Sequence, residues 1–455
     1  MVWPKNAQAF FKKLKLIHIL VGAFLLRLVL LPLTFHGDVT VTYWWGKFAS
    51  EFGWRGYYDW LNFGGYGRPD QPMLNIYYVW AIRQIYLFAY NILWFINIKI
   101  PMFPSAIMSW YFLYGNQILL KFPMILSDIA FIYAVFRFIK SEFNEFKAKI
   151  AALILALYIP LIYNSALWGS GDSIINLFGL LAVYSLYRKK YFVVPFFFLL
   201  SVLYKASLLI WSPLLLIMLL KQNTRIADYL KMAVFSLIFL YVICAPFSPV
   251  EINPIIWFFS TMSTKILPGA MPQLTANSFN FWALLFGLKP RLDELLILPH
   301  LSARLLSLII CLVFYTAILI NMWKHYSIKT VLLSLVNISM TTFMFMTRMH
   351  ERYTFPVLIP LLLLCFYDKK FIKYFLILTA THLLNVYNWW WFPLIPFLVS
   401  FLSIPAVIWT LSLVNLILSI KLLGIQLLSN VHSNKLFSFG FNFKKFNPSW
   451  LKSNS

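Results

Sequence analysis

The stretch MTRMHERYTFP, residues 346–356, places four ionisable side chains within five positions, between two strongly apolar runs. They are Arg348, His350, Glu351 and Arg352. A charge at the centre of a membrane helix costs about 2.5–3.5 kcal/mol on insertion scales, so such groups generally line a wet cavity or pair with each other. We expect Arg348 and Arg352, four positions apart, to share one helical face, where their forks would suit phosphate oxygens. The alternative is an internal Arg–Glu network that holds helix ends together.

Two other segments carry carboxylates. Asp38 follows the first apolar run, in FHGDVTVTYWW, where it could act as a general base on a hydroxyl acceptor, a role worth about 10²–10⁴ in rate. The alternative is a helix-end Asp that faces water. The stretch NSALWGSGDS places Asn164, Trp168 and Asp172 in a short turn. An exposed Trp beside a carboxylate would suit a sugar, whereas Asp172 or Ser173 could simply cap the next helix.

A lone lysine, Lys205, interrupts the apolar sequence SVLYKASLLIWSP. It could neutralise a phosphate whose lipid tail lies in the bilayer, or it could merely extend its ammonium group toward water. The sequence has no Walker loop, no dinucleotide fingerprint and no HExxH motif. An activated substrate must therefore arrive in a form other than a nucleotide.

The elements that position these residues are predicted from composition. Of the 455 residues 61% are hydrophobic and 11% charged, whereas charged residues make up about a quarter of soluble domains. Apolar runs long enough to cross a bilayer recur from end to end. They predict an all-α polytopic membrane protein with about twelve transmembrane helices. The expected helices cover 17–35, 116–139, 149–163, 173–187, 191–204, 206–220, 232–247, 303–323, 330–347, 353–367, 374–389 and 394–420.

The net charge of +24 is distributed as membrane topology predicts. With the N-terminus inside, the cytoplasmic segments hold 24 Lys and Arg against 4 Asp and Glu. The two long outer loops, 36–115 and 248–300, hold 8 basic and 7 acidic residues. The basicity is therefore a topology signal, and nucleic acid is not an expected partner. Residues 74–98 are long enough to span, but a crossing there would reverse this bias, so we expect an interfacial helix.

This topology predicts three parts of a multi-pass protein of the cell membrane. Residues 1–16 form a basic cytoplasmic N-terminus, 17–420 the transmembrane domain, and 421–455 a basic cytoplasmic tail. The charged residues of the stretches above all fall at outer helix ends. We therefore expect one polar site on the extracytoplasmic side.

Five stretches together resemble bacterial GT-C glycosyltransferases described as mannosyltransferases of the GPI-anchor second-mannose type. They are GDVTVTYWW, NSALWGSGDS, SVLYKASLLIWSP, TANSFNFWALL and MHERYTFP, in matching order over residues 17 to about 390. More distantly they are similar to eukaryotic glucosyltransferases that use dolichyl-phosphate glucose in N-glycan assembly, which have His-Glu-Lys in place of residues 350–352. The resemblance implies the GT-C fold, with a long first extracytoplasmic loop that carries interfacial helices.

Members of that superfamily move a sugar from a polyprenyl-phosphate donor to a hydroxyl acceptor, with inversion, and an aspartate of the first outer loop is the base. The site residues that the resemblance implies are Asp38 as the catalytic base; Lys205, His350, Arg352 and Arg348 at the donor phosphate; and Trp168, Asp172, Asn164 and Glu351 at the sugar or acceptor. The aspartate pair of some relatives is absent beside Asp38, so we expect no metal, and no cofactor is implied. The expected partners are the lipid-linked donor, a glycolipid, glycan or protein acceptor, and the bilayer.

A second class of protein remains open on the residues alone. A transporter or flippase for lipid-linked saccharides would also be polytopic and would carry membrane-embedded cations. Such proteins commonly show internal repeats and a site near the midplane. The two classes differ in the position of Asp38 relative to His350 and Arg352, since one shared outer cavity favours a transferase and a separation above about 15 Å favours transport.

Overall fold

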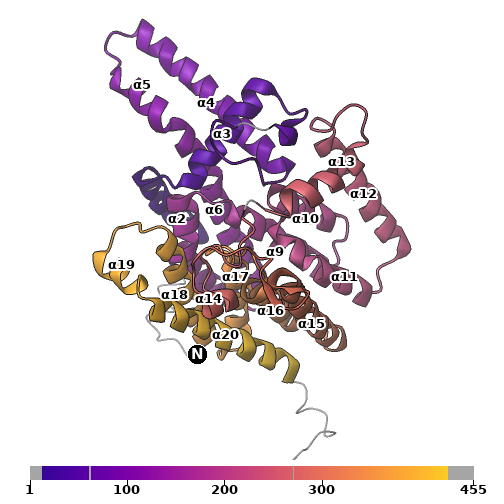
Figure 1. Cartoon of the computed structure of the whole chain (residues 1–455). Coiled ribbons are helices and arrows are strands. Elements are labelled where there is room, and N and C mark those ends of the chain that lie inside the picture. The colour runs from indigo at the N-terminus through magenta and orange to yellow at the C-terminus, as the bar shows by residue number, and fades with distance from the viewer. Residues whose placement is uncertain (1–12, 61–62, 270, 429–455) are drawn as a thin grey trace, which may run out of the picture.

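The structure is a computed structural model that describes residues 13–60, 63–269 and 271–428. Helices make up 75% of it, and the chain is a helical membrane protein (Figure 1). In chain order the helices are α2 (Leu16–Leu30), α3 (Gly37–Phe52), α4 (Met73–Lys99), α5 (Ala106–Trp110), α6 (Asn116–Glu142), α7 (Glu145–Ala156), α8 (Ile159–Ile162), α9 (Asp172–Tyr187), α10 (Val193–Tyr204), α11 (Ser212–Lys221), α12 (Ile226–Cys244), α13 (Pro254–Thr261), α14 (Phe281–Phe286), α15 (Ala303–Lys324), α16 (Ile328–Phe345), α17 (Phe355–Tyr367), α18 (Phe371–Trp389), α19 (Pro396–Leu402) and α20 (Pro405–Leu428). Two short strands, β1 (Leu296–Leu298) and β2 (Leu301–Ser302), pair antiparallel just before α15.

Among the described residues, seven helical segments are long and apolar enough to cross a membrane. They are Leu16–Leu33, Met73–Lys99, Ala106–Glu142, Ile226–Cys244, Ala303–Lys324, Ile328–Phe345 and Pro405–Leu428. An eighth would be the pair Glu145–Ala156 and Ile159–Trp168, which is bent by 49°. Each of the twelve ranges predicted from the sequence contains helix. That all twelve cross the bilayer, and that α4 lies along its surface, remain predictions.

Two predicted helices are broken where prolines interrupt them. The single helix expected over 394–420 is wrong, because α19 ends at Leu402 and α20 begins anew at Pro405. The helix expected over 149–163 ends at Ala156, and the chain restarts at Ile159 with Pro160 in the first turn of α8. Proline lacks the N–H that would continue the ladder but fits the first turn of a new helix.

The centre of the helical assembly is formed by α16 and α17 (Figure 1). Nearly every residue of α16 and the first ten of α17 are buried. This burial explains why the sequence of α17 is apolar on all sides rather than along one stripe. The segment between them, residues 346–354, therefore starts and ends on two of the most firmly held helices.

Buried cations fix the chain between α2 and α3. Arg27 of α2 and Asp128 of α6 form an ion pair at 2.7 Å, and neither side chain is exposed. Lys121 of α6 donates to the carbonyls of Leu31 and Thr34 at 2.7 and 2.9 Å. These contacts hold the end of α2 against α6, so the start of α3 has a defined position.

Helices α3 and α4 pack tightly at Gly46. A β-carbon there would lie 2.5 Å from the carbonyl oxygen of Val79, so only glycine allows this approach. Beyond this contact α4 and the returning α5 project away from the other helices (Figure 1). Large side chains of the projecting half, among them Phe88 and Phe95, are exposed.

Candidate functional site

Asp38 lies in the first turn of α3 and is held there from two directions. Its backbone N–H donates to Nδ1 of His36 at 3.1 Å. Its Oδ2 accepts a hydrogen bond from the indole Nε1 of Trp168 at 2.9 Å. His36 stacks on Trp168 with ring centroids 3.9 Å apart. The Asp38 side chain nevertheless remains 43% exposed, so one face of the carboxylate is open to solvent.

Arg352 joins three carboxylates that come from three distant segments. Its Nη2 lies 3.2 Å from Oδ2 of Asp38, and its Nε lies 3.5 Å from Oδ2 of Asp172. Its Nη1 donates to Oε1 of Glu351 at 2.8 Å. The side chains of Asp172 and Glu351 are 5% and 1% exposed, and that of Arg352 is 15% exposed. One guanidinium thus compensates charge that α3, α9 and the 346–354 segment bring together.

The second cation of the site is Lys205, at the end of α10. Its ammonium group donates to Oδ1 of Asp172 at 2.6 Å and lies 5.2 Å from the centre of the Tyr353 ring. Oδ2 of Asp172 accepts from the hydroxyl of Ser170 at 2.9 Å. The sequence allowed Asp172 or Ser173 to cap helix α9. This is wrong, because the N-cap residue is Gly171 and no side chain makes a capping hydrogen bond there. The Asp172 carboxylate is instead shared between two cations.

The 346–354 segment is not helical, which corrects the expectation that Arg348 and Arg352 share a helical face. Arg348 has a φ of 64°, and its N–H donates to the carbonyl of Gln273. His350 forms isolated bridges with residues 276 and 277 of the loop between α13 and α14. Because the backbone of this segment pairs with residues 273–277 instead of forming a helix, Arg348 and Arg352 contact different partners.

Arg348 makes a separate ion pair with Asp293. Its Nε and Nη2 lie 2.7 and 3.1 Å from the two carboxylate oxygens, and it also donates to the carbonyl of Pro268. The Asp293 side chain is completely buried. Arg348 is therefore largely committed to holding the loop that contains Asp293 against the 346–354 segment.

His350 is the more accessible neighbour of Glu351. Its Nδ1 lies 3.8 Å from Oε2 of Glu351, and its side chain is 27% exposed. Its ring centroid is 5.1 Å from that of Tyr353. The imidazole of His350 is therefore accessible to a ligand, whereas the carboxylate of Glu351 is buried behind the imidazole.

The electrostatics of the cluster favour the charged forms of its members. Burial would raise the pKa of Asp38, but the adjacent Arg352 and the contacts with His36 and Trp168 hold that pKa well below its ordinary value. Burial would also raise the pKa of Glu351, and the neighbouring His350 and the charge of Arg352 lower it. The three carboxylates in turn raise the pKa of Arg352, although burial opposes this. Asp38 and Glu351 are thus anions at neutral pH.

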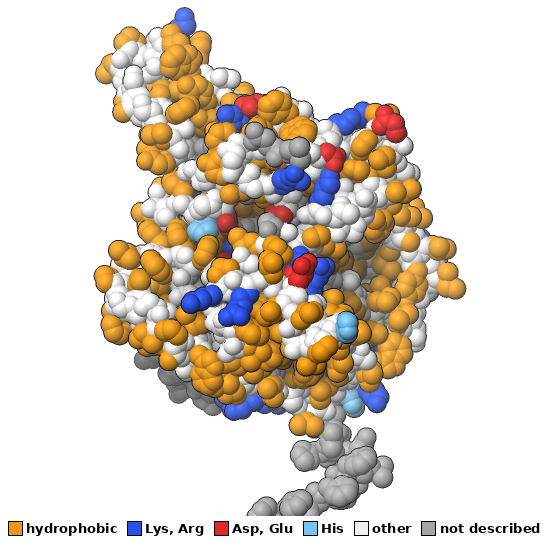
Figure 2. All heavy atoms as spheres, viewed as in Figure 1, with side chains coloured by type: hydrophobic (Ala, Val, Ile, Leu, Met, Phe, Trp, Pro, Cys, Tyr) orange, Lys and Arg blue, Asp and Glu red, His pale blue; other side chains and the backbone are white. Residues whose placement is uncertain are grey.

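A cavity of about 360 Å³ adjoins this cluster. Its charged lining residues are Asp70, Asp172, Lys205, Arg304, Arg348, His350 and Arg352. The remaining wall is largely apolar and includes Leu209, Ile266 and Leu308. Acidic and basic side chains gather around a hollow in the middle of the face drawn in Figure 2. Such a cavity suits an anionic head group that is attached to an apolar chain.

Two residues expected to contact a sugar are buried instead. Trp168 is 0% exposed, so the expectation of an exposed platform is wrong. Its indole positions Asp38, and the Arg352 guanidinium lies 5.2 Å from its ring centre. The Asn164 carbonyl accepts from the N–H groups of Gly169 and Ser170, so Asn164 shapes the turn that presents Trp168.

The sequence reasoning missed several residues that the site uses. The predictions from the sequence assign no role to His36, Asp293 or Tyr353. Asp293 is a completely buried acid in the loop between α14 and α15, a feature that its sequence RLDELL does not reveal. For Tyr353, the signal in the sequence is its position next to Arg352.

The site brings most of the predicted residues together. Contacts link Asp38, Asp172, Lys205, Glu351 and Arg352 in one network, with His350 at its edge. Within the described residues no group of three or more His, Cys, Asp or Glu side chains is arranged to hold a metal ion. Comparison of the sequence with models of known families and with curated proteins found no match.

Proposed function

We propose that this protein is an integral-membrane glycosyltransferase of the GT-C type, with twelve transmembrane helices and its site on the extracytoplasmic side. It moves a hexose from a polyprenyl-phosphate donor to a hydroxyl acceptor with inversion. The observation that carries the proposal is the contact of Arg352 with Asp38 at 3.2 Å, beside a cavity that combines cations with an apolar wall. The resemblance described above favours mannose as the sugar.

In the proposed reaction, Asp38 accepts the proton of the acceptor hydroxyl while that oxygen forms a bond to the anomeric carbon. The bond between the anomeric carbon and the phosphate oxygen breaks, and the electron pair leaves with the polyprenyl phosphate. Arg352, Lys205 and His350 are positioned to stabilise the charge that develops on this phosphate. Asp38 suits the role of base because it is ionised, partly exposed and fixed by Trp168.

The proposal explains why three carboxylates and two permanent cations converge in a chain with only 11% charged residues. A transporter of lipid-linked saccharides would not need an aspartate oriented by two aromatic neighbours beside the phosphate-binding cations. The direct contact of Asp38 with Arg352 is also far below the separation that would favour transport.

The test is transfer by the purified protein. The protein is incubated with polyprenyl-phosphate mannose or glucose that carries a labelled sugar, and released polyprenyl phosphate, free sugar and labelled membrane acceptor are measured. Asp38→Asn should lower turnover by about 10²-fold or more, whereas donor binding should persist. Glu51→Gln, on the same helix but half exposed and outside the cluster, is the matched control. Full turnover by Asp38→Asn would refute the role of Asp38, and no turnover of either donor would refute the proposed donors.

A further inference from the structure

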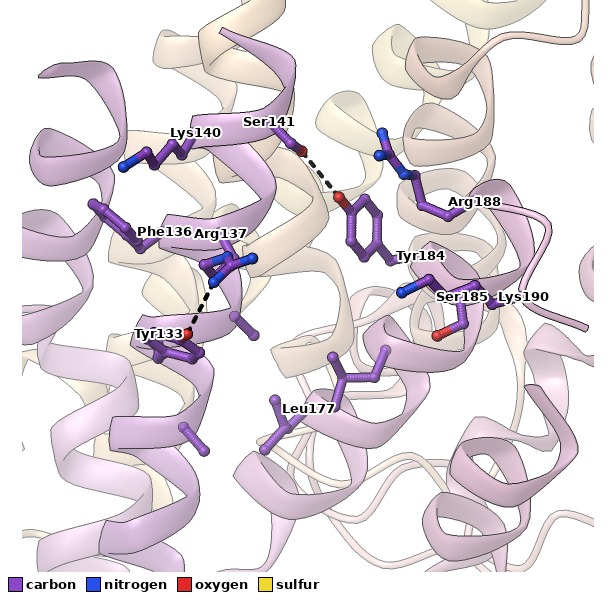
Figure 3. A pocket seen from close by; sticks show the side chains of 13 residues that line it. Tyr133, Phe136, Arg137, Lys140, Ser141, Leu177, Tyr184, Ser185, Arg188 and Lys190 are labelled. Atoms are coloured by element: carbon purple, nitrogen blue, oxygen red, sulfur yellow. Dashed lines mark hydrogen bonds between the residues drawn. The ribbon is translucent and has the colours of Figure 1, made fainter. Parts of the chain in front are cut away.

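A second, larger cavity lies at the opposite end of α9 from Asp172. It has a volume of about 1080 Å³ and is formed by α6, α9 and the turn after α9 (Figure 3). Figure 3 shows side chains of α6 on one wall and of α9 on the other. A hydrogen bond of 2.9 Å between Ser141 and Tyr184 joins the two walls. The cavity is therefore a defined groove between packed helices.

Polarity changes along the length of this groove. Its inner part is lined by apolar residues, including Ala130, Ala134, Leu177 and Leu181. The cations all lie nearer the helix ends; they are Arg137, Lys140, Arg188 and Lys190. From Ala130 to Lys140 the α-helical rise amounts to roughly 15 Å, about half the hydrocarbon thickness of a bilayer. The groove thus matches the dimensions and polarity of one leaflet.

Most of the positive charge in the groove is not neutralised by protein. Lys140 pairs with Glu145 at 2.7 Å. For Arg137, Arg188 and Lys190, no carboxylate of the described residues lies within ion-pair distance. Arg137 donates to the hydroxyl of Tyr133 at 3.2 Å, and its guanidinium is otherwise directed to the groove and solvent. Three exposed cations at the mouth of an apolar groove call for an anionic ligand with an apolar chain.

We propose that this groove binds an anionic phospholipid of the surrounding leaflet. The phosphate lies between Arg137 and Arg188, with Lys190 beside it, and an acyl chain lies on Ala134 and Leu177. Basic pockets between membrane helices recognise anionic head groups in this way. The charge distribution predicts that this end of the helices is cytoplasmic, so the lipid belongs to the inner leaflet. The inference does not depend on the glycosyl transfer proposed above.

Native mass spectrometry of the purified full-length protein tests this site. The protein is released from mixed micelles that contain equal amounts of phosphatidylglycerol and phosphatidylcholine, and the retained lipid is counted. Arg137→Gln combined with Arg188→Gln should weaken retention of phosphatidylglycerol roughly 30-fold, at about fivefold for each cation. Ala134→Phe, which fills the apolar part without a change of charge, should also lower retention. Lys189→Gln combined with Lys324→Gln removes the same charge outside the groove and serves as the control.

The outcomes separate the possible ligands. Retention of phosphatidylglycerol over phosphatidylcholine that is lost in both groove variants and kept in the control supports the proposal. Equal retention of the two lipids, or equal loss in the control, would overturn it. Competition by inorganic phosphate with no effect of Ala134→Phe would assign the groove to a soluble anion, which also overturns the lipid assignment. Thermal unfolding of each variant in lipid-free detergent shows whether Ala134→Phe is folded; if it is not, the paired Gln variants alone decide.

Discussion

Replacement of Arg352 by glutamine is the change to which the described site should respond most strongly. The guanidinium lies 3.2, 3.5 and 2.8 Å from oxygens of Asp38, Asp172 and Glu351. Without it, Lys205 remains as the cation beside Asp172, and Glu351 loses its only arginine partner. We expect a loss of stability that depends on pH in a predictable direction.

The magnitude follows from Glu351, whose side chain is 1% exposed. Removal of one partner from a buried ion pair costs about 3–5 kcal/mol. In the wild type the pKa of Glu351 is lowered, so its contribution to stability is present at neutral pH and is lost only as the pH falls through that lowered pKa. In Arg352→Gln burial becomes dominant and raises the pKa of Glu351 above its unfolded value. The Glu351 carboxyl then takes up a proton on folding. The loss of unfolding free energy in Arg352→Gln relative to wild type therefore shrinks by up to about 1.4 kcal/mol for each pH unit below the raised pKa.

The assay compares thermal unfolding of wild type and Arg352→Gln in detergent, from about pH 7.5 down to about pH 5.5. The unfolding temperature of Arg352→Gln should lie furthest below that of wild type at the higher pH, and this difference should become smaller toward the lower pH. Arg137→Gln, which removes an exposed arginine without a carboxylate partner, should show no such trend. If the stability lost in Arg352→Gln stays constant or grows on acidification, the conclusion that Arg352 compensates the buried charge of Glu351 is refuted.

Three further changes test contacts that position the site. Trp168→Phe removes the 2.9 Å hydrogen bond to Asp38 but keeps a ring, so sugar transfer should fall about tenfold with little change in donor KM. Arg27→Met leaves Asp128 buried without its cation and should cost about 3–5 kcal/mol in thermal or denaturant unfolding. Gly46→Ala places a β-carbon 2.5 Å from a backbone oxygen of α4, so α3 must shift, at a cost of about 1–3 kcal/mol in the same assay.

Each of these changes has a matched control. Trp94→Phe alters an exposed indole on α4 and should leave transfer unchanged. Adding Asp128→Asn to Arg27→Met should recover part of the lost stability, and strict additivity of the two would show that the pair is not coupled. Gly22→Ala adds a β-carbon with nothing within 4 Å, so a loss equal to that of Gly46→Ala would exclude crowding as the cause.

The sequence predicts the helices well because their signal is local. Length and hydropathy identify a helix such as α15 without knowledge of its neighbours. The breaks at Pro160 and Pro405 were not predicted, although the rule that proline cannot continue a helix applies to single residues. The sequence also predicts that the charged residues gather at one end of the helices. That conclusion requires only that successive membrane helices run in opposite directions, because every second connection then lies on the same side of the membrane.

The partners of each charged residue could not be predicted in the same way. The helical spacing of Arg348 and Arg352 suggested a shared face, but pairing of the segment with residues 273–277 turned Arg348 toward Asp293. The sequence interpretation takes Trp168 to be exposed in its short turn, yet His36 and Arg352 cover it. Both errors have one cause: contacts between segments more than 50 residues apart decide burial, and no local pattern records them.

The contact between Arg352 and Asp38 has a consequence for the proposed reaction. A general base is most effective when its pKa lies near the working pH, and Arg352 holds the pKa of Asp38 far below that range. A donor phosphate in the adjacent cavity would compete for the guanidinium and draw it away from the carboxylate, because Arg352 lines that cavity. The pKa of Asp38 would then rise as the donor binds, so the base would become effective only once the donor is in place. Donor binding before acceptor binding is therefore the expected kinetic order, and a random order would argue against this coupling.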